Sequence, residues 1–166
     1  MIFSSLKEYF YKMYNKAMVL LLLPMVVFLA IYYLLLSGFV SPVIFDQLAV
    51  DVLRISFPIL ILITLTIVHL VSNKRYKIIS EKIGLGEKLE LYYPINKQKM
   101  EAATYVSLLM ALGFFLTGHA WFSIYFSVIL LWFLWQWPSP RRVCSDLKLK
   151  GDEREMVMTK GEAFRN

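Results

Sequence analysis

Four long apolar runs, separated by polar intervals, set the pattern of this sequence. A run of about 20 apolar residues can cross the roughly 30 Å hydrocarbon core of a membrane as a helix. Each run approaches or reaches that length, so each is predicted to be one transmembrane helix. The predicted spans are residues 17–36, 52–71, 100–117 and 121–137. The pattern therefore predicts an all-α integral membrane protein with four transmembrane helices in two hairpins, spanning 17–137.

The N-terminal residues 1–16 differ from the run that follows, because they mix aromatic residues with lysines. Phe3, Leu6, Phe10 and Met13 recur at three- to four-residue spacing, which predicts an amphipathic helix lying at the membrane interface. The following apolar run is too long for a signal-peptide core, and no small-residue cleavage site follows it. This segment is therefore expected to be retained.

Breakers and tight connections separate the spans. Gly38 and Pro42 interrupt the segment after the first span, which is expected to fold back on the membrane surface. Asp51 is a candidate cap for the second span, because a carboxylate can accept the unpaired backbone N–H groups of a helix start. The connection at 118–120 allows only a tight hairpin between the third and fourth spans.

The central interval 74–99 is charged, with seven Lys/Arg against three Glu, and is interpreted as a cytoplasmic loop. Its first part, to about Ile83, is predicted to extend the second helix until Gly84 and Gly86 end it. Residues 89–95, LELYYPI, favour a β-like segment that stops at Pro94. Asn96 is then expected to cap the third span.

The tail 138–166 is hydrophilic, with scattered apolar residues. Residues 146–149 and 155–158 are interpreted as two short strands or as a helix and a strand, and Lys160-Gly161 as a turn. Together with the 74–99 loop, the tail could form a small cytoplasmic layer. A disordered tail is the alternative.

The placement of basic residues predicts the orientation. Seventeen of the 18 Lys/Arg fall in the N-terminal segment, the central interval or the tail, and only Arg54 lies elsewhere. Basic segments stay on the cytoplasmic side of a membrane. Both termini and the central interval are therefore expected to be cytoplasmic, in a bacterial-type inner (plasma) membrane.

Composition agrees with a membrane protein. The chain is 58% hydrophobic and 18% charged, whereas soluble domains average about 45–50% and about 25%. The net charge of +6 borders the apolar runs, where cationic side chains meet lipid headgroups, so no nucleic-acid partner is predicted. The single cysteine, Cys144, excludes an internal disulfide, and it is expected to be an ordinary reduced thiol rather than a palmitoylated one.

Few residues offer chemistry. The two histidines, His69 and His119, lie near opposite ends of the predicted bundle, so neither a haem nor a metal site is predicted and no cofactor is expected. The spans contain no mid-span acid, and no nucleophile motif is present, so an enzyme is less expected than a non-enzymatic protein. Arg54, three residues after Asp51 on one helix face, is predicted to form a local ion pair. Arg54 and His69 are the candidate contacts for a ligand or headgroup.

The third span carries small residues at four-residue steps, the pattern of close helix contacts in lipid. Ala103, Ser107 and Ala111 are therefore the candidate helix-packing residues.

These observations favour a non-enzymatic accessory or scaffold subunit of a larger inner-membrane complex. The expected partners are the lipid bilayer and other membrane-protein subunits, with a homo-oligomer left open. Partners would dock through the helices and through the basic central interval and the tail, and the candidate docking residues in the tail are Arg141, Arg142, Glu153, Arg154 and Glu155. The alternative is a lipid- or hydrophobic-ligand-binding protein or small transporter, and a lipid-modifying enzyme is the least favoured reading.

Overall fold

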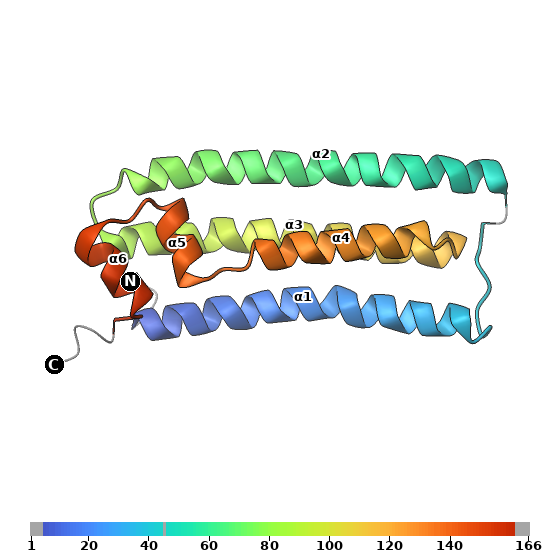
Figure 1. Ribbon diagram of the computed structural model, residues 1–166, viewed down its shortest axis with the longest axis horizontal. Coiled ribbons are helices and arrows are strands. Elements are labelled where there is room, and N and C mark those ends of the chain that lie inside the picture. Colours follow the sequence, from blue (N-terminus) through green and yellow to red (C-terminus); the bar gives the residue numbers. More distant parts are fainter. Residues whose placement is uncertain (1–4, 45, 162–166) are drawn as a thin grey trace. The chain divides into compact units, whose positions relative to one another are not determined.

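The computed structural model describes residues 5–44 and 46–161, and every regular element in these ranges is a helix (Figure 1). In chain order the helices are α1 (Leu6–Leu36), α2 (Gln47–Ser80), α3 (Leu85–Thr117), α4 (Trp121–Trp135), α5 (Pro140–Asp146) and α6 (Gly151–Met158). The predicted all-helical class is confirmed for this part of the chain.

Three of the helices, α1, α2 and α3, are long and apolar enough to span a membrane. Helix α4 is also apolar, but it has only 15 residues. At 1.5 Å of rise per residue it is about 22 Å long, shorter than a typical hydrocarbon core. The helices therefore support an integral membrane location.

Helix α1 replaces the predicted separate segment 1–16 and first span. Its start is capped by Ser5, whose Oγ accepts the Glu8 N–H at 3.1 Å, and the helix then continues to Leu36. Phe10 and Met13, from the predicted amphipathic stripe, are buried in the protein. Phe3 lies outside the described residues. The described part of the stripe therefore packs against other helices of the chain, and residues 6–16 continue directly into the apolar run as one helix.

Helix α2 begins before the predicted second span. The Asp46 carboxylate accepts the Ala49 N–H at 3.2 Å, so Asp46 caps the helix and the predicted cap at Asp51 is wrong. Asp51 lies one turn inside the helix and pairs with Arg54 at 3.4 Å, as its spacing predicted. The predicted extension beyond the apolar run is confirmed, because α2 continues to Ser80 and only the short link 81–84 separates it from α3.

Helix α3 overturns the reading of 74–99 as a loop with a β-like part. It begins at Leu85 and passes through Pro94, and Asn96 lies inside it rather than at its cap. An interior proline costs a helix about 3 kcal/mol. Burial of Tyr92, Asn96 and Met100 around this proline favours the continuous helix and offsets that cost.

The tail forms two short helices, so the predicted strands at 146–149 and 155–158 are wrong. Ser139 caps α5, because its Oγ accepts the Arg142 N–H at 3.2 Å and Pro140 occupies the first turn. The predicted turn at Lys160-Gly161 is confirmed by positive φ angles of 53° and 80°.

The chain divides into two compact units. Unit 1 comprises Met1–Met18, Val68–Met100 and Trp137–Asn166. Its core joins all three segments, and Figure 1 shows α5 and α6 beside the ends of the longer helices that belong to this unit. The buried core residues are Tyr9, Phe10, Met13, Tyr76, Ile79, Leu89, Tyr92, Val143, Cys144, Leu147, Leu149 and Val157.

Unit 2 comprises Val19–Ile67 and Glu101–Gln136 and is built mainly around α3 and α4. Phe28 of α1 stacks on Phe126 of α4 with ring centroids 4.1 Å apart. The Thr104 hydroxyl donates to the Leu20 carbonyl at 2.8 Å. The small residues Ala103, Ser107 and Ala111 are each at most 1% exposed.

The close packing of α3 on α4 can be tested by a substitution at Gly113. A Cβ at this glycine would lie 2.4 Å from the ring of buried Phe122. We expect Gly113→Ala to lower the thermal unfolding temperature in detergent, although alanine favours a helix by about 1 kcal/mol over glycine. The matched control is Gly84→Ala, where a Cβ meets nothing within 4 Å and φ is not positive. Equal unfolding temperatures for the two variants would contradict the close approach.

Candidate functional site

The strongest candidate site is a group of polar side chains in unit 1, which we call the polar cluster. It consists of His69 and Tyr76 of α2, Tyr92 and Lys99 of α3, and Arg142 and Asp146 of α5. Asp146 joins two of the helices, because its Oδ2 accepts the Tyr92 hydroxyl at 3.0 Å. Its Oδ1 lies 3.7 Å from the Arg142 Nε on the same helix.

Lys99 is the most deeply buried cation of the cluster, with 3% of the residue exposed. Its Nζ lies 5.8 Å from the centre of the Tyr76 ring, and that ring stacks on Tyr92 at 4.8 Å. Burial lowers the pKa of Lys99 to about 8, since a charged amine loses its hydration there; nearby Asp146 opposes the change. The site therefore holds an amine that can lose its proton close to neutral pH.

Asp146 also titrates away from its ordinary range. Burial raises the pKa of its carboxyl, while the Tyr92 hydrogen bond and the Arg142 and Lys99 charges oppose that rise. Burial likewise raises the pKa of Tyr92, so its hydroxyl keeps its proton and acts as the donor in this bond. The geometry thus fixes both the direction and the partners of the hydrogen bond between α3 and α5.

A second polar contact holds α6 to α3. The Lys88 Nζ donates to both carboxylate oxygens of Glu153, at 2.7 and 3.0 Å. The Lys88 side chain is 9% exposed and that of Glu153 30%, so the pair is largely shielded from water. A shielded and bidentate pair is stronger than a typical surface ion pair.

Helix periodicity explains how α3 supplies several of these groups. Lys88, Tyr92 and Lys99 are separated by four and seven residues, so they lie along one side of the helix. Ala103 and Ser107 continue the same spacing. One stripe of α3 therefore changes from small residues to polar and aromatic ones along its length.

The two predicted ligand contacts fall in different units. Arg54, in unit 2, is engaged with Asp51. His69, in unit 1, lies near enough to Lys99, Arg142 and Asp146 to feel their charges, and its Nε2 is 2.9 Å from the Asn73 side-chain nitrogen. The structure thus brings His69, but not Arg54, into the polar cluster.

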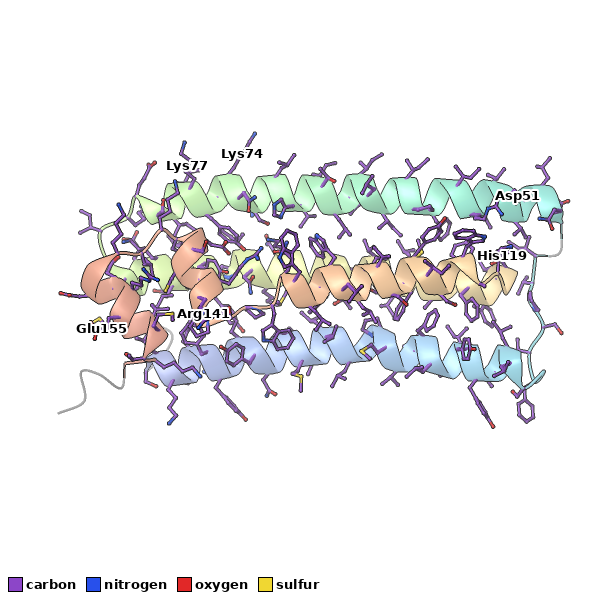
Figure 2. The ribbon with its side chains drawn as sticks, in the orientation of Figure 1. Asp51, Lys74, Lys77, His119, Arg141 and Glu155 are labelled. Atoms are coloured by element: carbon purple, nitrogen blue, oxygen red, sulfur yellow. The ribbon has the colours of Figure 1, made fainter. Side chains whose placement is uncertain are left out.

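The five predicted docking residues separate into two kinds. Arg142 and Glu153 face partners inside unit 1, as described above. Arg141, Arg154 and Glu155 are exposed, and Arg141 and Glu155 are labelled in Figure 2. Only the exposed three are available to a partner without breaking an internal contact.

Cys144 belongs to the hydrophobic core of unit 1 and is 6% exposed. Burial raises the pKa of its thiol, which makes the thiol less reactive. Within the ranges that the structure describes, no three His, Cys, Asp or Glu residues gather as a metal site would require.

Most of the cluster was missed by the reasoning from sequence. Lys99 was counted among the charges of the central interval, and Asp146 was placed in a possible strand. Extending the small-residue stripe of α3 backwards from Ala103 would have reached Lys99 and Tyr92. The apparent break at Pro94 hid that continuity.

The Lys88–Glu153 pair generates a prediction for the stability of unit 1. Glu153→Gln leaves the Lys88 ammonium shielded without its carboxylate; this loss costs about 3–5 kcal/mol in a fully buried pair. We expect a smaller but clear loss of stability of unit 1. Because Cys144, the single cysteine, is buried in the core of this unit, the loss is measured as at least fivefold faster alkylation of its thiol by a maleimide.

The control is Glu155→Gln on the same helix, because Glu155 is exposed and forms no ion pair in the described part of the chain. Its alkylation rate should stay within twofold of the parent protein. Equal rates for the two variants would show that the Lys88–Glu153 pair does not hold unit 1 together.

Comparisons of the chain with protein-family models, with curated proteins and with solved structures found no match. The functional argument therefore depends on the residues and contacts described above.

Proposed function

We propose that this protein is a non-enzymatic accessory or scaffold subunit of a larger complex in a bacterial-type inner membrane. The observation that carries the proposal is that its charged segments fold into a compact unit with a hydrophobic core of its own. A folded polar unit offers partners a fixed arrangement of charges, whereas a loose loop and tail would have to be ordered at a cost in entropy.

The segments of unit 1 also support four membrane crossings. Because these segments form one compact unit, the proposal places all of them on the same side of the membrane. In the proposed topology, α1 and α2 form one pair of crossings, and α3 and α4 form the other. The short α4 would cross by local thinning of the bilayer. The basic residues of unit 1 orient it, with both termini, toward the cytoplasm.

Exposed apolar faces supply the membrane-embedded part of the proposed docking surface. In the most apolar windows of α1 and α2, only 11% and 17% of the residues are buried, against 50% in α3. On α1 one exposed stripe follows helical spacing: Leu22, Val26, Leu29 and Tyr33 are 47%, 65%, 59% and 64% exposed. Such faces pack against lipid or against the helices of another subunit.

The polar part of the docking surface is assigned to Arg141, Arg154 and Glu155. They come from α5 and α6, which the core of unit 1 holds in place through Val143 and Val157. Mixed charges on a fixed surface favour specific partners more than raw affinity.

Purification from the native membrane in a mild detergent tests the proposal. We expect co-purifying membrane proteins in fixed stoichiometry, identified by mass spectrometry. Exchanging two neighbouring charges, Arg154→Glu with Glu155→Arg, should reduce their recovery at least fivefold while the amount of this protein in the membrane stays constant. Recovery of the parent protein alone, as a stable monomer, would refute the scaffold function.

The control is the corresponding exchange Glu81→Lys with Lys82→Glu, in the link after α2, which also leaves the net charge unchanged. Partner recovery should be retained. Equal losses from both exchanges would mean that α6 is not a specific docking site.

A second candidate function is the binding of a lipid or another hydrophobic ligand. It is favoured by an open apolar groove in unit 2 between α1 and α3, with a volume of about 360 Å³. Its lining residues are Val27, Ile31, Leu108, Ala111, Leu112 and Phe115. Ligand sites are commonly apolar clefts of about 300–1,000 Å³.

This function predicts the effect of filling the groove. Leu112 lines it and is 46% exposed, so a larger side chain can enter the groove without disrupting the core. Leu112→Trp should lower the amount of lipid that stays bound in native mass spectrometry at least threefold. Leu109→Trp, at a position on α3 that is 39% exposed and does not line the groove, is the matched control. Equal lipid retention in both variants would eliminate the groove as a binding site.

A further inference from the structure

The polar cluster of unit 1 contains a buried cation, Lys99, that forms no ion pair with any described residue. The charge of the Asp146 carboxylate acts on both Lys99 and Arg142. Its oxygens are already engaged by the Tyr92 hydroxyl and by Arg142. The Lys99 Nζ lies over the face of the Tyr76 ring, 5.8 Å from its centre.

His69 adds a further donor that lacks an acceptor. The Asn73 side-chain nitrogen, which can only donate, lies 2.9 Å from the His69 Nε2. With the Asn73 amide in this orientation the Nε2 accepts, and a neutral imidazole then carries its proton on Nδ1. That Nδ1 is enclosed and has no hydrogen-bond partner in the described part of the chain. The Nδ1 group is a second donor in this cluster without an acceptor.

Burial of Lys99 is unfavourable in the protein as described. A buried ammonium without a carboxylate partner costs free energy, and an apolar side chain of similar size would be more stable there. Residues that cost stability in this way are commonly found at functional sites. A bound anion would remove the cost, because it would supply both negative charge and acceptor oxygens.

The chain positions of these donors indicate where such an anion comes from. Lys99 directly precedes the apolar run 100–117, His69 lies near the end of the run 52–71, and Arg142 follows the run 121–137. Basic side chains at the ends of apolar segments meet lipid headgroups in a membrane. A phosphate group offers at least two acceptor oxygens and a full negative charge, which suits donors that converge from α2, α3 and α5.

We propose that the polar cluster binds a phosphate group, with Lys99 and His69 donating to its oxygens and the Arg142 guanidinium adding positive charge beside it. The phosphate belongs either to the headgroup of an anionic phospholipid or to a soluble phosphate compound. Asp146 and Tyr92 hold Arg142 and α5 in position rather than binding the ligand. This site lies within unit 1, so it depends neither on the docking residues of α6 nor on the groove of unit 2.

The test is a pH titration of the lysine side chains in the full-length protein, reductively methylated with ¹³C and followed by NMR. The pKa of Lys99 is about 8 without ligand. We expect it to rise by at least one unit when the cluster is occupied, because the phosphate stabilises the charged amine. The samples contain dodecyl maltoside alone, or with added phosphatidylglycerol, sodium phosphate, or sodium acetate at matched ionic strength.

Lys77 of α2 provides the internal reference, because it belongs to the same unit and its side chain is exposed and points outward from its helix (Figure 2). Any general effect of an anionic micelle raises both pKa values, whereas a bound phosphate raises that of Lys99 more. The variants Lys99→Gln and Lys77→Gln assign the two signals. If Lys99→Gln fails to fold, the signal of Lys99 is still identified in the parent protein by its low pKa.

The responses distinguish the sources of the phosphate. A rise with phosphatidylglycerol alone assigns a lipid headgroup, and a rise with sodium phosphate alone assigns a soluble phosphate compound. A rise with both supports the site for either source. A shift of Lys99 no larger than that of Lys77 in all samples, or an equal shift with acetate, would overturn the proposal.

Discussion

The hydrogen bond from Tyr92 to Asp146 is the contact on which the arrangement of unit 1 depends. It joins α3 to α5 inside the protein, where an unsatisfied carboxylate or hydroxyl would cost about 1–3 kcal/mol or more. Because α5 is held there, Val143 and Cys144 reach the core and Arg142 lies beside Asp146. The ion pair between Lys88 and Glu153 then holds α6 to the same side of α3. Polar contacts thus position the tail, and apolar burial stabilises it.

The helical class was predicted from the sequence because a long apolar run in a membrane forms a helix, in which every backbone group is paired within the same segment. The prediction was less accurate at the polar ends. Residues 89–95 contain residues that favour strands, and Pro94 suggests a boundary, yet α3 continues through both. The reason is tertiary: Tyr92 and Asn96 are buried against the rest of unit 1, and a local propensity does not include that energy.

The candidate site was harder to predict than the fold, for a related reason. His69 and Arg142 were named from the sequence, each for a different role, and the structure brings both near Asp146. Lys99 was one charge among many, and nothing in its neighbours along the chain distinguishes it from exposed Lys77. The difference between the two lysines arises only when α2 and α5 cover α3. A role that depends on contacts between residues far apart in the sequence leaves no local signal.

The order in which the core of unit 1 is assembled has a consequence for biogenesis. Tyr9 and Phe10 emerge first from the ribosome, yet their core includes Val143, Leu147 and Val157, which are synthesised only after all four apolar segments. Contacts so distant in sequence form late. During synthesis the N-terminal part of α1 therefore exposes aromatic surface until the tail arrives, and such surface is prone to aggregation or to capture by chaperones. Completion of the tail acts as a checkpoint, because the core of unit 1 can close only after Val143, Leu147 and Val157 have been synthesised.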